Sequence, residues 1–238
     1  FSAHTFRFIL PKFPPIFAPC FLALNTILKH SGGNPTLPPQ VLRGLPNNVT
    51  TTMDLALWQV AVAIRGDSSV AQVFLKGSAE ELAGRYLQGR LPPAAQSAIA
   101  GFMQAYGMRG TGEIDIGQPR WRDDPTPVMQ TLRSYLQIDP DQAPDAVFAR
   151  GKQSGLEAVE KITAQARRKP LGFIQERQVR AAARRLQLLM GARETPKFLV
   201  VRLMGIARQG ILTCGREFTE AGTIDRPDDL FFLRISEL

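Results

Sequence analysis

Hydrophobic positions recur at intervals of three and four residues along most of the chain, which is the spacing of an α-helix. The first clear run follows Thr50: Thr52 is expected to cap it, and apolar residues up to Ile64 cover most of its sides, so we expect a buried helix. Further helices are predicted over residues 78–87, 94–106, 127–137, 144–168, 171–191 and 194–220. Only residues 230–233 favour a strand. The predicted fold class is all-α, with at most a short C-terminal strand.

The N-terminal part has a different pattern. Residues 13–28 form the most apolar stretch, but a membrane span needs about 20 apolar residues, and Pro19 interrupts this one. We expect a loop and a short buried helix there, although a signal peptide with Arg7 and Lys12 as its basic part is an alternative. Glycines and prolines in residues 31–39 predict a linker or long loop. The predicted organisation is an N-terminal segment and linker over residues 1–40 and a helical domain over residues 41–238.

Charge and rare residues limit the chemistry. The chain has 238 residues and a formal net charge of +8, which favours anionic partners such as nucleic acid, anionic membranes or phosphorylated ligands. Its two cysteines, Cys20 and Cys214, and its two histidines, His4 and His30, lack metal-ligand spacing, so no metal site is predicted. Two reduced thiols favour the cytoplasm. No phosphate-cradling glycine motif and no phosphohistidine motif occurs, so we expect no catalytic residue and no cofactor in this chain.

The densest polar cluster lies in residues 106–125. Glycines at positions 107, 110 and 112 allow positive φ angles and close backbone approach. Arg109 and Arg120 lie among several carboxylates, including Glu113 and Asp115. One interpretation is an ion-paired loop in which Arg109 binds Glu113 or Asp115. The other is a ligand loop in which Arg109 or Arg120 binds an anion through two hydrogen bonds.

A second cluster consists of Arg193, Glu194 and Lys197 at the start of the longest predicted helix. Arg193 and Lys197 are one turn apart and can share a helix face. Cations are unfavourable at a helix N-terminus, because the helix dipole is positive there. The pair therefore indicates a bound anion or a nearby carboxylate, for which Glu194 is one candidate.

A third cluster is basic: residues 167–169 are Arg-Arg-Lys, and further arginines follow on the next helix. This spacing is typical of a solvated helix face. Single-stranded nucleic acid binding would need interleaved aromatic residues for stacking, and only Phe173 is near.

Four motifs in one order resemble a known family. They are Gly44-Leu-Pro-Asn-Asn-Val-Thr-Thr51 with Met53-Asp-Leu55; Tyr106-Gly-Met-Arg109 through Glu113-Ile-Asp115 and Pro119-Arg-Trp121; Arg193-Glu194 with Lys197-Phe198; and Asp228-Asp-Leu-Phe-Phe-Leu233. Over residues 41–238 the chain resembles the central, substrate-binding domain of the rifampicin phosphotransferase and phosphoenolpyruvate synthase-like enzymes.

The resemblance implies a three-part enzyme. An ATP-grasp domain, with ATP and Mg²⁺, would transfer the β-phosphate to a histidine on a mobile domain, and that histidine would phosphorylate a substrate held by the helical domain. It implies that Arg193 and Lys197 contact the substrate or the incoming phosphoryl group. Met53, Arg109, Glu113 and Arg120 lie in the shared motifs and are expected to bind substrate as well.

The chain departs from the family pattern at two positions. Thr52 stands where the family usually has Glu, so a role of that carboxylate would be lost. Asp123 stands where Glu is usual, which keeps the charge.

The function expected from these observations is a fragment or split homologue of such a phosphotransferase, inactive as an isolated chain. Its partners would be a small molecule, such as a rifamycin or pyruvate, and the ATP-grasp and phosphohistidine domains, in the same chain or as separate chains. Two alternatives are a non-catalytic structural or interaction module and a basic, helical nucleic-acid-binding domain. We expect no membrane partner.

Overall fold

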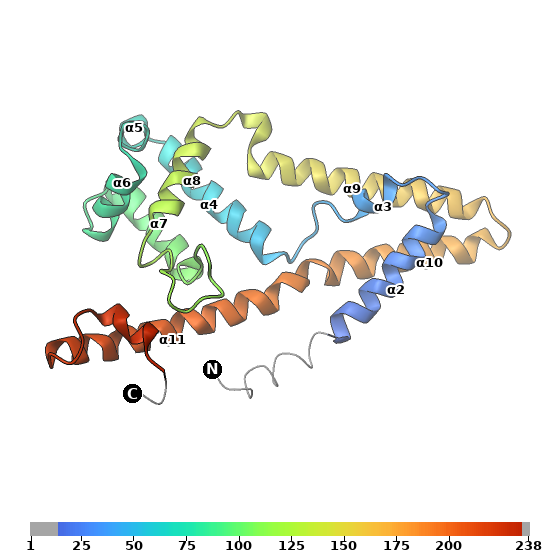
Figure 1. Cartoon of the computed structure of the whole chain (residues 1–238). Coiled ribbons are helices and arrows are strands. Elements are labelled where there is room, and N and C mark those ends of the chain that lie inside the picture. Colours follow the sequence, from blue (N-terminus) through green and yellow to red (C-terminus); the bar gives the residue numbers. More distant parts are fainter. Residues whose placement is uncertain (1–13, 235–238) are drawn as a thin grey trace. The chain divides into compact units, whose positions relative to one another are not determined.

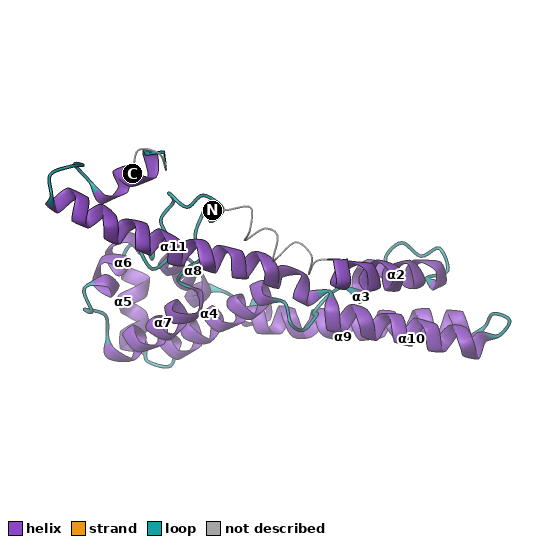
Figure 2. Ribbon diagram, turned by 90° about the horizontal axis from the view of Figure 1, so that it is seen from below, coloured by secondary structure: helices purple, strands orange, loops and turns teal. Residues whose placement is uncertain are grey.

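Helices make up the regular structure throughout residues 14–234, the part of the chain that the computed structural model describes (Figures 1 and 2). His4 lies outside this part. The prediction of an all-α fold with at most a short C-terminal strand is confirmed. At residues 230–233, where that strand was possible, most of the segment belongs to a 3-10 helix, η4 (Pro227–Phe232). Pro227 fixes its first turn, and the Asp229 carboxylate accepts the Arg226 N–H at 2.8 Å, which closes the turn.

The chain forms two compact units. Unit 1 comprises the described part of residues 1–55 together with residues 139–196, and unit 2 comprises residues 56–138 with the described part of 197–238. The division falls within the helix α4 (Val49–Arg65) and near the start of α11 (Thr195–Glu220).

Unit 1 is built on a helical hairpin of α9 (Pro144–Arg167) and α10 (Gly172–Leu189) (Figure 1). Helix α2 (Pro14–His30) packs on α10, and α3 (Leu37–Val41) packs on α9. Two 3-10 helices, η2 (Pro140–Gln142) and η3 (Gly191–Glu194), complete the unit. These four α-helices share one buried apolar core, whose members are Cys20, Ala23, Ile27, Leu37, Val41, Ala158, Val159, Ile162, Ala166, Val179, Ala182, Ala183 and Leu186.

The N-terminal part is more helical than its composition predicts. The expected loop and short helix are one 17-residue helix, α2, that continues through Pro19. A proline inside a helix costs about 3 kcal/mol, whereas each fully buried aliphatic side chain contributes about 1.5–3 kcal/mol. Ala23 and Ile27 are buried one turn apart, and Cys20 joins them, so burial outweighs the lost hydrogen bond.

The loop expected over residues 31–39 also needs correction, because its end begins α3. Prolines are tolerated in the first turn of a helix, where no backbone N–H is needed. Residues of α2 and α3 belong to the same core as those of α9 and α10. The domain boundary at residue 40 stays a prediction.

Unit 2 contains most of α4 and four shorter helices, α5 (Ser68–Lys76), α6 (Ala79–Leu87), α7 (Pro93–Tyr106) and α8 (Thr126–Gln137), followed by α11 and η4. Helix α8 packs against α5 and α6. The sequence analysis missed α5, which is short and buries only Val70 and Phe74. Its start is set by Asp67, whose carboxylate accepts the N–H groups of Ser69 and Val70.

The start of α4 corrects the predicted cap. The side chain of Asn48, not Thr52, accepts the N–H groups of Thr50 and Thr51. Thr52 lies one turn inside the helix, and its hydroxyl donates to the Asn48 carbonyl at 3.0 Å. The helix is also less buried than expected, because Gln59 and Val62 are exposed.

A single helical stretch of the described chain, Gly172–Glu220, contains a window apolar enough to cross a membrane by length and composition alone. Buried helices of other proteins meet the same criterion, so this is weak evidence, and the absence of a membrane partner stays a prediction.

Gly44 provides a test of the packing in unit 1. It has φ +58°, and a Cβ there would overlap the backbone of Lys152 in α9. Gly33 has φ +78° but open space around it. We expect Gly33→Ala to cost about 1–2 kcal/mol from the backbone conformation alone, and Gly44→Ala to cost about 1–3 kcal/mol more from overlap. Urea unfolding followed by circular dichroism measures both, and equal losses would contradict the close approach.

Candidate functional site

The candidate site lies in unit 2, in the loop between α7 and α8. The two limbs of this loop are joined by backbone hydrogen bonds from Trp121 N–H to the Arg109 carbonyl (2.7 Å) and from Arg122 N–H to the Gly107 carbonyl (3.0 Å). Gly112 has φ +69°, and a Cβ on Gly110 would lie 2.7 Å from the Pro119 carbonyl oxygen. The predicted positive φ is confirmed at Gly112 and the predicted close approach at Gly110, whereas Gly107 has a helical φ of −62°.

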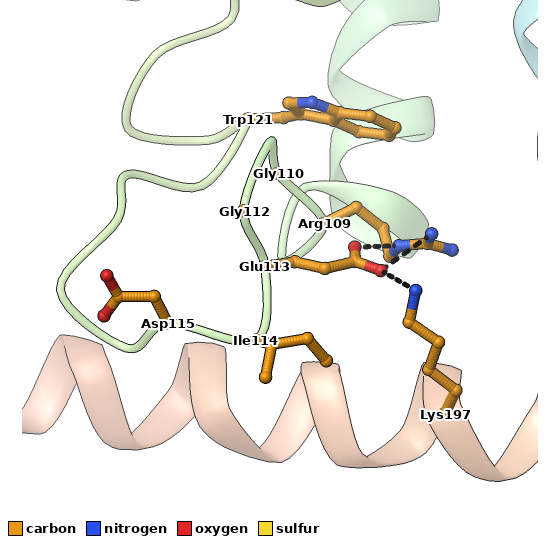
Figure 3. A pocket seen from close by; sticks show the side chains of 8 residues that line it. All are labelled: Arg109, Gly110, Gly112, Glu113, Ile114, Asp115, Trp121 and Lys197. Atoms are coloured by element: carbon orange, nitrogen blue, oxygen red, sulfur yellow. Dashed lines mark hydrogen bonds and ion pairs between the residues drawn. The ribbon is translucent and has the colours of Figure 1, made fainter.

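Glu113 is the centre of the site (Figure 3). Its carboxylate accepts hydrogen bonds from Arg109, including Nη2–Oε1 at 3.0 Å, and forms an ion pair with Lys197 of α11, with Nζ–Oε1 at 3.1 Å. The ion-paired interpretation of Arg109 is therefore confirmed. Lys197 comes from a distant part of the sequence, and the sequence analysis did not connect it with Glu113.

The three charged groups differ in exposure. The side chains of Glu113 and Arg109 are 9% and 15% exposed, whereas that of Lys197 is 55% exposed. Burial by itself raises the pKa of Glu113, but the hydrogen bonds and charges of Arg109 and Lys197 outweigh it and hold the pKa below its ordinary value. Glu113 is therefore a carboxylate at neutral pH, held rigidly by Arg109 and more loosely by Lys197.

These residues line an open cavity of about 610 Å³. Its wall consists of Arg109, Gly110, Gly112, Glu113, Ile114, Asp115, Trp121 and Lys197. The Trp121 ring stacks on Phe102 of α7 with ring centroids 6.3 Å apart, which fixes the apolar side of the cavity. The cavity thus combines two cations and two carboxylates with one aromatic face, an arrangement that can hold a strongly polar group next to an apolar one.

Arg208 of α11 binds the loop between α7 and α8. Its side chain is 5% exposed and donates to the carbonyls of Ile116 (3.0 Å) and Gly117 (2.7 Å). It also pairs with Asp123 (3.2 Å) and Asp228 (3.3 Å). The guanidinium of Arg208 therefore connects α11 both to the loop and, through Asp228, to η4.

Arg120 is buried within the same loop. It is 1% exposed, and its Nη2 donates to the Asp115 carbonyl at 3.2 Å. Burial, and then the charge of Arg208, lower the pKa of Arg120. The structure shows Arg120 bonded to the loop backbone, and its predicted contact with a ligand stays a prediction.

The other predicted site residues lie in unit 1. Arg193, in η3, pairs with Glu194 (Nη2–Oε1 3.0 Å), the partner that the sequence offered. It also lines an apolar cavity of about 440 Å³ with Phe17, Phe21, Met190 and neighbouring residues of α2. Met53 is half-buried in the first part of α4. Their predicted roles in substrate binding stay predictions.

Two residues of the site were missing from the predicted set. Trp121 was noted in its motif but not assigned to the site, and only the three-dimensional structure shows it in the cavity wall. Arg208 had a usable signal: Val201, Gly205 and Gly215 are buried on the same side of α11, so Arg208 is a charge on an apolar helix face. A charge at such a position indicates a buried ion pair.

The described residues contain no group of three or more His, Cys, Asp or Glu side chains that could hold a metal ion. The absence of a cofactor from this chain stays a prediction.

The low pKa of Glu113 predicts a pH dependence. A carboxylate whose pKa is lowered by folding stabilises the protein above the unfolded-state pKa, and this contribution is lost as pH falls through the folded-state pKa. We expect Glu113→Gln to be destabilised relative to the unsubstituted chain at pH 7, and the difference to shrink below about pH 4.5. Urea unfolding at pH 7 and pH 3.5 measures it. A difference independent of pH would show that the carboxylate charge does not matter.

Arg208 provides a second prediction. Arg208→Met leaves two half-buried carbonyls and Asp123 without their donor, and we expect a loss of about 2–4 kcal/mol in the free energy of unfolding. Arg216→Met, at an exposed position of the same helix, should change it by less than about 0.5 kcal/mol. Thermal and urea unfolding measure both substitutions, and a similar result for the two would contradict the role of Arg208.

Comparison with known proteins gives the family. The sequence model described as the rifampicin phosphotransferase fourth domain matches residues 12–194. The chain is 26% identical over 217 residues to a rifampicin phosphotransferase of Bacillus subtilis, and 25% identical over 214 residues to one of Streptomyces sviceus. These alignments cover 91% and 90% of the chain but 25% of each relative.

An uncharacterized protein of Mycobacterium tuberculosis is similar to the same degree, with 25% identity over 91% of the chain and 21% of the relative. The chain thus spans about a quarter of the length of the curated relatives it matches. The family match covers most of the chain and includes unit 1 up to Glu194. The chain belongs to the family of the rifampicin phosphotransferase fourth domain.

Proposed function

We propose that the chain is the substrate-binding part of an ATP-dependent phosphotransferase, and that the cavity around Glu113 binds the polar end of the substrate or the phosphoryl group. The observation that carries this proposal is the pairing of one carboxylate with two cations, Arg109 and Lys197, in an open cavity. In a structural ion pair the two charges satisfy each other, but here one carboxylate faces two cations.

Arg109 and Lys197 differ in exposure, and we assign them different roles. Arg109 is held by two hydrogen bonds to Glu113 and stays in place. Lys197 is more exposed and has one contact with Glu113. An incoming anion can therefore replace Glu113 as the partner of Lys197 at a small cost in free energy. In this proposal Glu113 keeps both cations oriented before the ligand arrives, and Lys197 neutralises charge on the ligand when it binds.

The apolar part of a substrate has two candidate surfaces. In unit 2 the candidate surface is the face of Trp121. In unit 1, taken by itself, it is the apolar cavity with Arg193 at its edge, as a separate candidate binding site. An apolar cavity with a single cation suits a large, mostly apolar molecule that carries a negative or strongly polar group, as rifamycins do.

The complete enzyme would also need partners. In the proposal, ATP and Mg²⁺ bind to an ATP-grasp domain, and a separate domain carries the phosphohistidine, either in the same chain or as separate chains in the cytoplasm. The matched region is about a quarter of the length of the similar rifampicin phosphotransferases. This supports the proposal that other domains carry the ATP site and the phosphohistidine. Thr52, in place of the usual Glu, would weaken a contact that depends on that carboxylate.

One observation favours the alternative that the chain is a non-catalytic interaction module. Leu199, Leu203 and Ile206 of α11 are exposed at helical spacing and form an apolar stripe that an interaction module would use. Co-purification of an ATP-grasp protein or a phosphohistidine protein with a chain that binds no small molecule would favour this alternative.

Ligand binding tests the proposal. Calorimetric titration with rifamycin SV and with phosphoenolpyruvate is expected to show binding in the micromolar range to at least one of them. Lys197→Gln should weaken it about tenfold, which corresponds to about 1.4 kcal/mol. Lys76→Gln removes the same charge from an exposed position of unit 2 and should leave the affinity unchanged. Absence of binding at high micromolar concentration, or an equal effect of both substitutions, would reject the proposal.

A further inference from the structure

A smaller cavity of about 300 Å³ lies in unit 1, where α2 ends and α10 begins. We call it the α10 pocket. It is lined by Lys29, His30, Lys169, Leu171, Ile174, Gln175 and Gln178. The family motifs do not include these residues, and the proposed function does not use them.

The α10 pocket is cationic. It is lined by two lysines and a histidine, and no carboxylate is among the lining residues. In the part of the chain that the structure describes, neither Lys29 nor Lys169 has an ion pair. The same lysines line the cavity with His30. Burial, and then the charges of Lys169 and Lys29, lower the pKa of His30.

The pocket also contains polar atoms that lack a partner. His30 is 4% exposed, and its Nδ1 has no hydrogen-bond partner among the described residues. The same holds for Oε1 of Gln175, whose Nε2 donates to the Pro170 carbonyl at 3.0 Å. Buried polar atoms without partners cost free energy, and a hydrogen-bonding ligand in the cavity would reduce this cost.

The N-terminus of α10 points to the charge of that ligand. Leu171 occupies the N-cap position with φ 57°, and a leucine side chain cannot cap the first amides of the helix. The first turn has no acidic residue. The N–H groups of Ile174 and Gln175 donate to the Leu171 carbonyl at 2.9 and 3.4 Å, so they are not available to a ligand. The 18-residue helix nevertheless presents the positive end of its dipole at this end of the pocket.

A purely structural explanation covers part of this arrangement. Lys29 lies in the last turn of α2, and Lys169 follows the end of α9, where cations stabilise the helix dipole. This explanation accounts neither for the buried, unpartnered nitrogen of His30 nor for the uncapped start of α10.

We propose that the α10 pocket binds a phosphate-class anion, held by Lys29, Lys169 and His30 beside the positive end of the α10 dipole. A cavity of this size accepts a single phosphate group. The phosphate has two possible sources, a soluble molecule or a lipid headgroup, because Leu171 and Phe173 beside the pocket are 66% and 71% exposed.

The two histidines of the sequence make the test direct. The imidazole signals of His4 and His30 in the full chain are assigned by nuclear magnetic resonance with a His4→Gln variant. Inorganic phosphate is then titrated at constant ionic strength and pH 7. The signal of His30 is expected to shift saturably while that of His4 does not.

Charge substitutions establish specificity. Lys169→Gln and Lys29→Gln should each weaken phosphate binding about tenfold, because each removes a charge-assisted hydrogen bond. Lys161→Gln removes one charge from an exposed position of α9 and is the matched control, with unchanged binding. All of these residues except His30 are exposed, so the folded state is expected to survive, and circular dichroism verifies it.

Vesicles distinguish the source of the phosphate. Co-sedimentation with phosphatidylcholine vesicles that contain phosphatidic acid, but not with pure phosphatidylcholine, would identify a lipid phosphate if Lys169→Gln and Phe173→Ser both abolish it. Binding of free phosphate without co-sedimentation would identify a soluble one. The proposal is overturned if neither probe binds, or if Lys161→Gln has the same effect as Lys169→Gln. These results do not depend on rifamycin or phosphoenolpyruvate binding.

Discussion

The buried guanidinium of Arg208 is the interaction on which unit 2 depends. The loop between α7 and α8 has little regular structure of its own, and it needs an external anchor to present Glu113 in a defined position. Arg208 supplies the anchor through two carbonyls of the loop and Asp123, and it joins η4 to α11 through Asp228. Burying this cation is costly, and only its several oxygen partners together offset the cost.

This anchor explains why the candidate site is formed before any ligand binds. With the loop fixed to α11, Glu113 lies within reach of Lys197 on the same helix, and Arg109 fixes the other side of the carboxylate. The ring of Trp121 is held in place by stacking on Phe102. A preformed site of this kind loses less conformational freedom on binding, which leaves more of the contact energy for affinity.

The sequence predicted what depends on local interactions and failed where distant contacts decide. Long helices such as α9 and α11 have strong periodicity and were placed within about one residue of their observed ends. Pro19 reads as a break locally, but the buried face of α2 overrides it. In the site, Arg109 and Glu113 are four residues apart and their pairing was foreseen. The pairing of Glu113 with Lys197 depends on how the chain folds back, which periodicity does not encode.

The positive net charge can now be located. Several exposed cations are matched by carboxylates, as Arg180 is by Glu160 and Glu176. In unit 2 the cavity around Glu113 is balanced, because its wall holds Arg109 and Lys197 together with Glu113 and Asp115. The α10 pocket in unit 1 is not balanced: two lysines without an ion pair among the described residues line it, and no carboxylate is among the lining residues. Matched surface pairs contribute little to long-range attraction. An anionic ligand therefore gains most at the α10 pocket, and this gives the overall charge a specific meaning that composition alone did not have.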